Sequence, residues 1–137
     1  MSYTSQPASS PIADAVRFLG HVTPIQSAIE RSAVVVVPSM GEGFGMVALE
    51  AMERARPVIA AAIGGLGEIV RDGETGVLVP PGEAEPLARA IVRVAGDREL
   101  ARRMGEAGRQ RALARFLQSF CTERTELLYE DALSRLL

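Results

Sequence analysis

The fold of this chain is decided by residues 39–70, which read SMGEGFGMVALEAMERARPVIAAAIGGLGEIV. Four consecutive valines, residues 34–37, come just before this stretch. A short run of β-branched apolar residues is typical of a strand that is covered on both faces. The chain then passes through Gly41, Gly43 and Gly45 and continues with helix-forming residues whose apolar side chains recur at helical spacing. A strand, a glycine loop and a helix in this order direct free backbone N–H groups and the positive helix end at one point, which favours an anion such as phosphate.

A second unit of the same kind follows directly. Residues 57–61 predict another buried strand, and residues 64–67, GGLG, predict a second glycine loop. In a parallel sheet, the loops that follow successive strands open at the same carboxyl edge, where ligands bind. The sequence therefore predicts a ligand site between two glycine loops.

The remaining elements alternate between strands and helices, and only helices follow after about residue 86. Two further strands are predicted, at residues 16–19 and 77–79. The predicted helices cover residues 25–31, 46–54, 66–70, 86–96, 99–107, 110–116 and 119–137, with an interruption near Gly108. This pattern predicts an α/β fold with a mainly parallel sheet of about four strands and a helical tail over residues 110–137. Residues 1–14 are expected to be a disordered leader, because the start of the chain is polar and rich in serine.

Composition limits the classes of function. The chain has 137 residues, which suits one domain, and its net charge of −2 argues against nucleic acid as a partner. All 15 basic residues are arginine, so a mechanism that needs lysine would have to take it from another chain. No apolar run approaches the ~18 residues of a membrane span. The single cysteine, Cys121, permits no internal disulfide and fits a reducing, cytoplasmic compartment, and no clustered acidic site for a metal is apparent.

Two carboxylates flank the first glycine loop. Glu50 lies about one turn into the predicted helix, where it could accept two hydrogen bonds from a diol such as a ribose. Glu42 precedes the helix, close to where a group attached to the phosphate would project. Alternatively, Glu42 is a solvated loop residue and Glu50 is an acid near the helix start that complements the helix dipole. The residues by themselves leave both interpretations open.

These residues also carry a resemblance to a known family. Residues 42–52, EGFGMVALEAM, resemble the E-x7-E segment of retaining GT-B glycosyltransferases of the glycosyltransferase-4 type. Residues 56–60, 64–70 and 72–82 are similar to the next blocks of that family in order and spacing, and residues 16–20, VRFLG, resemble the block upstream. The similarity runs from about residue 15 to the C-terminus and implies part of a GT-B C-terminal lobe, a Rossmann-like fold with three α/β/α layers. The departures are local: Gly67 stands where proline is usual, Ala55 where glycine is common, and Ala33 where aspartate is frequent.

The resemblance implies a binding site for a nucleotide-diphosphate sugar, the donor for retaining glycosyl transfer, without a further cofactor. Glu42 would contact the sugar hydroxyls as the catalytic residue, and Glu50 would hold the ribose. The implied donor-binding residues are Ser39, Gly43, Phe44, Gly45, Met46, Val47, Glu50, Gly64 and Gly65. The family's upstream βα units, with their Arg and Lys for the diphosphate, and its acceptor-binding lobe have no counterpart in these residues. We therefore expect weak donor binding, and no transfer by this chain alone.

The sequence leaves one alternative function open and disfavours a second. A catalytically inactive nucleotide-binding or interaction module remains an alternative. A dinucleotide-binding domain, suggested by the glycines at 41, 43 and 45, fits poorly because Met46 stands where glycine is needed and residues 60–62 are alanines where an acid is needed.

The resemblance also predicts an unprotected sheet edge. Without the upstream strands, residues 34–37 would form an edge that presents unpaired N–H and C=O groups. Leucines of the tail would form an apolar patch in water. We expect either that residues 16–19 pair with this edge or that another copy of the chain covers the edge or the tail, which would give a homodimer or aggregation.

Overall fold

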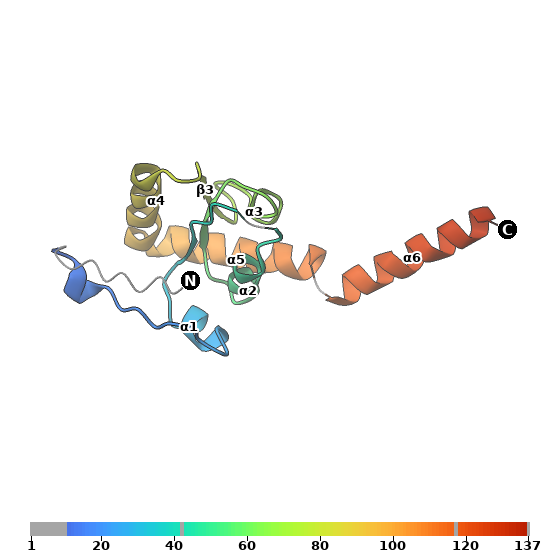
Figure 1. Ribbon diagram of the computed structural model, residues 1–137, viewed down its shortest axis with the longest axis horizontal. Coiled ribbons are helices and arrows are strands. Elements are labelled where there is room, and N and C mark those ends of the chain that lie inside the picture. Colours follow the sequence, from blue (N-terminus) through green and yellow to red (C-terminus); the bar gives the residue numbers. More distant parts are fainter. Residues whose placement is uncertain (1–10, 42, 117, 137) are drawn as a thin grey trace.

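The computed structural model describes residues 11–41, 43–116 and 118–136, and a three-stranded parallel sheet lies at its centre (Figure 1). The strands are β1 (Val35–Val37), β2 (Val58–Ala61) and β3 (Gly76–Val79). The helices are η1 (Ala13–Ala15, a 3-10 helix), α1 (Gln26–Glu30), α2 (Met46–Glu53), α3 (Leu66–Ile69), α4 (Ala84–Gly96), α5 (Arg98–Arg115) and α6 (Gln118–Leu136). The predicted α/β fold is therefore confirmed, with three strands in place of about four.

The strands lie in the order β1-β2-β3, so each βα unit adds its strand beside the previous one. Val36 pairs with Ile59, and Ile59 pairs with Val77 on its other side. Ala61, the last residue of β2, pairs with Val79, the last residue of β3. Because the strands are parallel and in register, their carboxyl ends and the loops that follow lie together at one edge.

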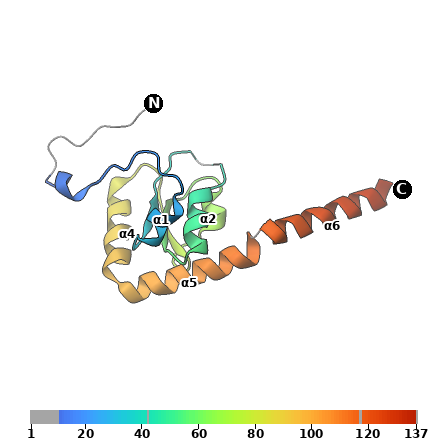
Figure 2. The ribbon, with the colours of Figure 1, turned by 90° about the horizontal axis from the view of Figure 1, so that it is seen from below.

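Side chains of the central strand alternate between two cores. Val58 and Ala60 pack with residues of α1, α2 and α3, whereas Ile59 packs with residues of α4 and the first half of α5. This two-residue period places a helical layer on each face of the sheet. Figure 2 shows α4 on one side, α1 and α2 on the other, and α5 running beneath them.

Helix α5 is one continuous helix, and the predicted interruption near Gly108 is wrong. Gly108 and Gly105 are buried within it and permit close packing. A Cβ added at Gly105 would lie 2.1 Å from the carbonyl oxygen of Ala55, and one at Gly108 would lie 3.3 Å from Cγ of Met52. These glycines bring α5 against α2 and the turn that follows it, a role that sequence reasoning confused with helix termination.

The predicted strand at residues 16–19 is also wrong. Val16, Phe18 and Leu19 are 41%, 52% and 58% exposed and lie in irregular structure. A strand needs a paired neighbour and a packed face, and this segment has neither. Among the described residues, β1 pairs with β2 alone and so forms the sheet edge expected for residues 34–37. Coverage of that edge by a second copy stays a prediction.

The two ends of the chain leave the central body in different ways. Of the predicted leader, residues 1–10 lie outside the described residues, while Ala13 and Asp14 belong to the short helix η1. Helix α6 projects away from the other elements, with Leu127, Leu128 and Leu133 exposed as expected (Figure 1). None of the helices in the described part of the chain combines the length and apolarity needed to cross a membrane.

The first prediction concerns Ala55, where the family commonly has glycine. Its φ is +53°, in the left-handed region that costs an L-residue roughly 1–2 kcal/mol relative to glycine. Glycine gains freedom in the unfolded chain, which offsets about 0.4–1 kcal/mol of this. We expect Ala55→Gly to raise the free energy of unfolding by about 0.5–1 kcal/mol in urea titrations. Ala114→Gly, in the exposed helical part of α5, should instead lower it by about 1 kcal/mol, and equal losses in both variants would contradict strain at Ala55.

The second prediction tests why α5 contains Gly105. Alanine is the better helix former by about 1 kcal/mol, so propensity alone would make Gly105→Ala stabilising. The added methyl group would press on the Ala55 carbonyl, and overpacking costs about 1–3 kcal/mol. We expect Gly105→Ala to lower the free energy of unfolding by about 1 kcal/mol or more. Gly96→Ala is the matched control, because a Cβ at the end of α4 meets nothing within 4 Å; a stabilised Gly105→Ala would refute the packing role.

Candidate functional site

The two glycine loops meet at the carboxyl edge of the sheet. The backbone N–H of Gly65, in the loop after β2, donates to the carbonyl oxygen of Gly43, in the loop after β1, at 3.2 Å. A Cβ at Gly65 would lie 2.5 Å from the carbonyl oxygen of Phe44 and 2.7 Å from its Cα. Only a residue without a side chain allows this backbone-to-backbone approach. The structure thus brings together the two loops that the sequence placed at one edge.

Gly45 completes the junction. Its φ is +91°, a conformation that L side chains rarely adopt, and a Cβ there would lie 2.7 Å from Cδ2 of Leu66. Leu66 begins α3 and is fully buried. Gly45 is therefore required both for the turn of the first loop and for its packing against the second.

Helix α2 begins at this junction. Gly45 is its N-cap, and the first helical hydrogen bond runs from the N–H of Leu49 to the carbonyl oxygen of Gly45 at 3.2 Å. The amides of Met46, Val47 and Ala48 come before that ladder begins, as the first amides of every helix do. The side chains of Met46 and Val47 are exposed, so this helix end opens to solvent. Such amides and the helix dipole together attract an anion.

Glu50 lies on the same side of α2 as this opening. It is the fifth residue of the helix, and Met46 and Val47 precede it by four and three residues, which places all three on one face. Helical side chains lean toward the N-terminus, so the Glu50 carboxylate is directed back along α2. Gln26 of α1 donates from Nε2 to Oε2 of Glu50 at 3.4 Å. The first turn of α2 carries no acidic residue, which removes the helix-dipole interpretation of Glu50.

The other predicted site residues fall around the same loops. Ser39 is half-buried in the segment after β1, and Gly64, with a φ of +52°, precedes the contact residue Gly65. Phe44 is 48% exposed at the tip of the first loop. Glu42, the predicted catalytic residue, lies outside the described residues.

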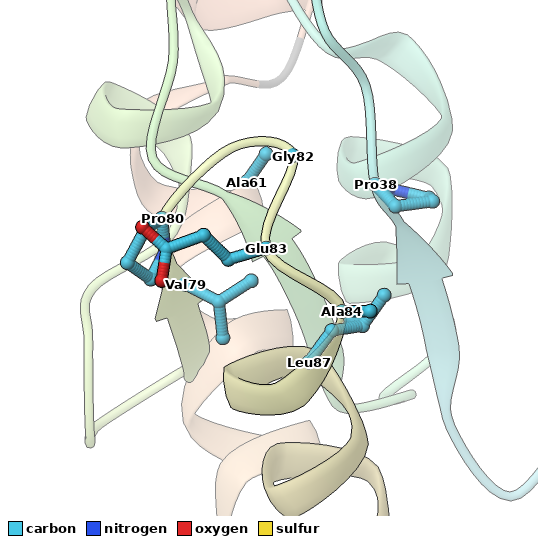
Figure 3. Close-up of a pocket in the computed structure, with 8 residues that line it drawn as sticks. All are labelled: Pro38, Ala61, Val79, Pro80, Gly82, Glu83, Ala84 and Leu87. Carbon is cyan, nitrogen blue, oxygen red and sulfur yellow. The ribbon is translucent and has the colours of Figure 1, made fainter.

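A cavity at this edge was missed by sequence reasoning. It has a volume of about 210 Å³ and opens on the α4 side of the sheet. Figure 3 shows its lining from the ends of the three strands and the start of α4: Pro38, Ala61, Val79, Pro80, Gly82, Glu83, Ala84 and Leu87. Glu83 is the one charged side chain among them, so this mainly apolar cavity differs in chemistry from the glycine loops. In the described part of the chain, no three His, Cys, Asp or Glu side chains are grouped so as to hold a metal ion.

At the end of α5, Phe116 reaches the first glycine loop, and Arg111 lies beside Phe116. The ring of Phe116 meets the ring of Phe44 edge-on, with 6.3 Å between centroids and 72° between planes. The guanidinium carbon of Arg111 lies 5.8 Å from the centroid of the Phe116 ring. The sequence offered a weak signal, because Phe116 is one of only four phenylalanines. The helix break expected near Gly108 hid the fact that α5 continues to this point.

Comparison with known proteins identifies the family. Residues 5–111 match the family described as Glycosyl transferases group 1. The chain belongs to this family. The match begins at residue 5, ahead of the domain boundary predicted at residue 15. The three parallel strands and their helices match solved GT-B glycosyltransferase neighbours, so the fold is GT-B-like.

Individual members of the family give the scale of the similarity. The D-inositol 3-phosphate glycosyltransferase of Streptomyces griseus is 48% identical over 98 residues, covering 70% of this chain and 21% of that protein. Sucrose-phosphate synthase of Thermosynechococcus elongatus superposes with a TM-score of 0.81 at 40% identity, covering 89% of this chain and 31% of that one. HepE of Anabaena in complex with UDP superposes with a TM-score of 0.79 at 31% identity, covering 85% of this chain and 33% of HepE. HepE has also been solved with UDP-glucose. The chain therefore spans about a third or less of each of these relatives.

The third prediction tests the contact between the glycine loops. Gly65 has a φ of −62°, which alanine adopts without strain, so any cost of Gly65→Ala comes from the collision with Phe44. We expect this variant to lower the free energy of unfolding by about 1–3 kcal/mol and to speed exchange at the Leu49 amide, which donates to the loop carbonyl of Gly45. Gly67→Ala, two residues further along in α3, meets nothing within 4 Å, so it should not lower the free energy of unfolding and should leave the loop exchange unchanged. Similar behaviour of the two variants would show that the loops do not depend on this contact.

Proposed function

We propose that this chain is the donor-binding part of a retaining glycosyltransferase of the glycosyltransferase-4 type, and that it binds a nucleotide-diphosphate sugar at the two glycine loops. One observation carries the proposal: the exposed start of α2 lies where the two loops touch. Free amides and a positive helix end at that point suit a diphosphate. HepE, a structural neighbour, binds UDP and UDP-glucose, which supports a nucleotide-sugar as the ligand class.

In this proposal the two sides of the α2 opening bind different parts of the donor. The backbone of residues 43–47 faces the sugar and the diphosphate, with Ser39, Gly64 and Gly65 beside it. Glu50 accepts hydrogen bonds from the ribose hydroxyls, and its contact with Gln26 holds the carboxylate toward α1. Glu42 contacts the sugar hydroxyls.

The chemistry would depend on stabilising the leaving group. In retaining transfer the sugar acquires oxocarbenium character while the diphosphate departs with its negative charge. Backbone amides that already point at the diphosphate stabilise that charge without reorganising, which is an efficient form of electrostatic catalysis. This scheme uses the chain's own backbone at residues 43–47 and requires no metal ion.

The alternative is a nucleotide-binding module without activity. The chain spans about a third or less of its relatives, and glycosyl transfer requires the acceptor to be held against the donor. We expect the 137-residue chain by itself to bind a nucleoside diphosphate without transferring sugar. Turnover of a sugar nucleotide by the purified chain, abolished in Glu42→Ala, would instead show that these residues suffice for transfer.

The fourth prediction separates the ribose from the diphosphate. Hydrogen bonds to a charged group contribute about 1.5–3 kcal/mol, so Glu50→Gln should weaken UDP binding by roughly tenfold or more in calorimetric titrations. Inorganic diphosphate, which lacks a ribose, should lose less than about twofold. Glu53→Gln, with the same charge change one turn further along α2, is the matched control and should alter neither affinity.

Two results would contradict the proposal in different places. Equal losses for UDP and diphosphate in Glu50→Gln would remove the ribose role of Glu50 while leaving the anion site in place. Failure of the unsubstituted chain to bind either ligand would remove the anion site itself. We expect the affinity of the unsubstituted chain for UDP to be weaker than about 1 μM, because the proposed contacts to the diphosphate are backbone amides, whereas charge-assisted bonds from lysine and arginine are the strong ones.

A further inference from the structure

We propose that Arg111 and Phe116, at the end of α5, are positioning residues for the first glycine loop and that they set its affinity for a nucleoside diphosphate through Phe44. The inference rests on the proposed function. Arg111 and Phe116 do not themselves reach the opening of α2, so they act on it through Phe44. Three contacts of the α5 end support it.

Arg111 ties α5 to the second glycine loop. Its Nε donates to the carbonyl oxygen of Ile69 at 2.9 Å, and its Nη2 donates to the carbonyl oxygen of Glu68 at 2.7 Å. These carbonyls belong to the last turn of α3, where the carbonyl oxygens of a helix have no N–H donor within the helix itself. The planar guanidinium fits two neighbouring acceptors at once, which a lysine ammonium does not. Because Gly65 is the N-cap of α3, Arg111 fixes the element that follows the second loop.

Phe116 ties the same helix end to the first loop. Its ring stands edge-on to Phe44 in the geometry that aromatic pairs prefer, and the Arg111 guanidinium lies over the Phe116 ring. Phe116 is also half-buried against the core formed by α1, α2 and α3. The ring is therefore held by the body of the protein, and Phe44 is held by the ring.

Burial lowers the pKa of Arg111 in this cluster. Desolvation, followed by the nearby positive charges of Arg71 and Arg115, lowers the pKa of Arg111 below its usual value. The group remains a cation at neutral pH, because the pKa of an arginine starts far above neutrality. Its contacts with the two carbonyls and the ring therefore persist over the pH range of ordinary binding measurements.

The first loop needs such a support. Phe44 is about half exposed and stands between Gly43 and Gly45, and glycine gives a turn more conformational freedom than any other residue. Gly65 fixes the backbone of the loop on one side, and Phe116 fixes the side chain of Phe44 on the other. With both supports, the amides at the start of α2 are held in place before a ligand arrives, which lowers the ordering cost of binding.

The test uses amide exchange, which reports the loop without any ligand. Phe116→Leu keeps an apolar side chain against the core and removes the ring, while Phe116→Tyr keeps the ring. We expect Phe116→Leu to speed exchange at the amides of Leu49 and Gly65, which donate to the loop carbonyls of Gly45 and Gly43, by roughly two- to tenfold relative to β2, and to weaken UDP binding by a similar factor. Phe116→Tyr should behave as the unsubstituted chain, and so should Leu113→Ala, which removes an exposed apolar side chain from the same helix.

Each outcome decides the matter. Exchange that rises equally in the loop and in β2 would mean that Phe116 serves global stability alone, and an unchanged loop would mean that Phe44 needs no support; either result overturns the inference. If Phe116→Leu does not fold, Arg111→Lys carries the test, because it keeps the charge and loses the two-pronged contact with α3, and it should speed loop exchange in the same direction. Absence of UDP binding in the unsubstituted chain would refute the proposed function, while loop exchange would still decide the positioning role.

Discussion

A direct contact between two stretches of backbone determines the site. The loop after β1 and the loop after β2 approach so closely that a single methyl group at Gly65 would collide with the carbonyl oxygen of Phe44. Parallel pairing of β1 and β2 brings both loops to one edge, and the absence of side chains lets them touch. The direction of α2 follows from this contact, because Gly45 caps the helix within it. The proposed anion site would therefore arise from packing alone, without a charged side chain.

The strength of such a site has a physical limit. A helix end contributes about 0.3–1 kcal/mol toward an anion when it is exposed to solvent and salt, and up to about 2 kcal/mol when it is partly buried. A hydrogen bond to a charged group contributes about 1.5–3 kcal/mol. The start of α2 is exposed at Met46 and Val47, so it belongs near the lower end of that range. Backbone geometry alone can direct a diphosphate to this point, but tight binding requires cationic side chains in addition.

Much of this arrangement could be predicted from the sequence, and the limits are instructive. The valine run, the two glycine loops and the helix after Gly45 were recognisable because each has a strong local pattern, and their meeting at one edge follows from parallel pairing. Residues 16–19 carry an equally good strand pattern but pair with no strand in the described part of the chain, and a local pattern holds no information about a neighbour. Gly108 was misinterpreted for a related reason. A glycine can end a helix or allow a neighbouring element to pack closely against it, and the sequence alone does not distinguish these two roles. The contacts of Gln26 with Glu50 and of Phe116 with Phe44 join residues 24 and 72 positions apart, and no periodic signal connects them.

Helix α5 unites these features. Its 18 residues span about 27 Å, roughly twice the length of a four-residue strand, so it is long enough to cross all three layers. Near its start, Leu100 and Met104 fill the core on the α4 face, and in its second half Ala112 enters the core on the α2 face. Gly105 packs against Ala55 in the turn after α2, and Phe116 packs against Phe44 in the loop before α2. One straight helix thus contacts the chain on both sides of α2. A shift of α5 at Gly105 would then move the support of the glycine loop at the far end, which links the packing of the fold to the geometry of the site.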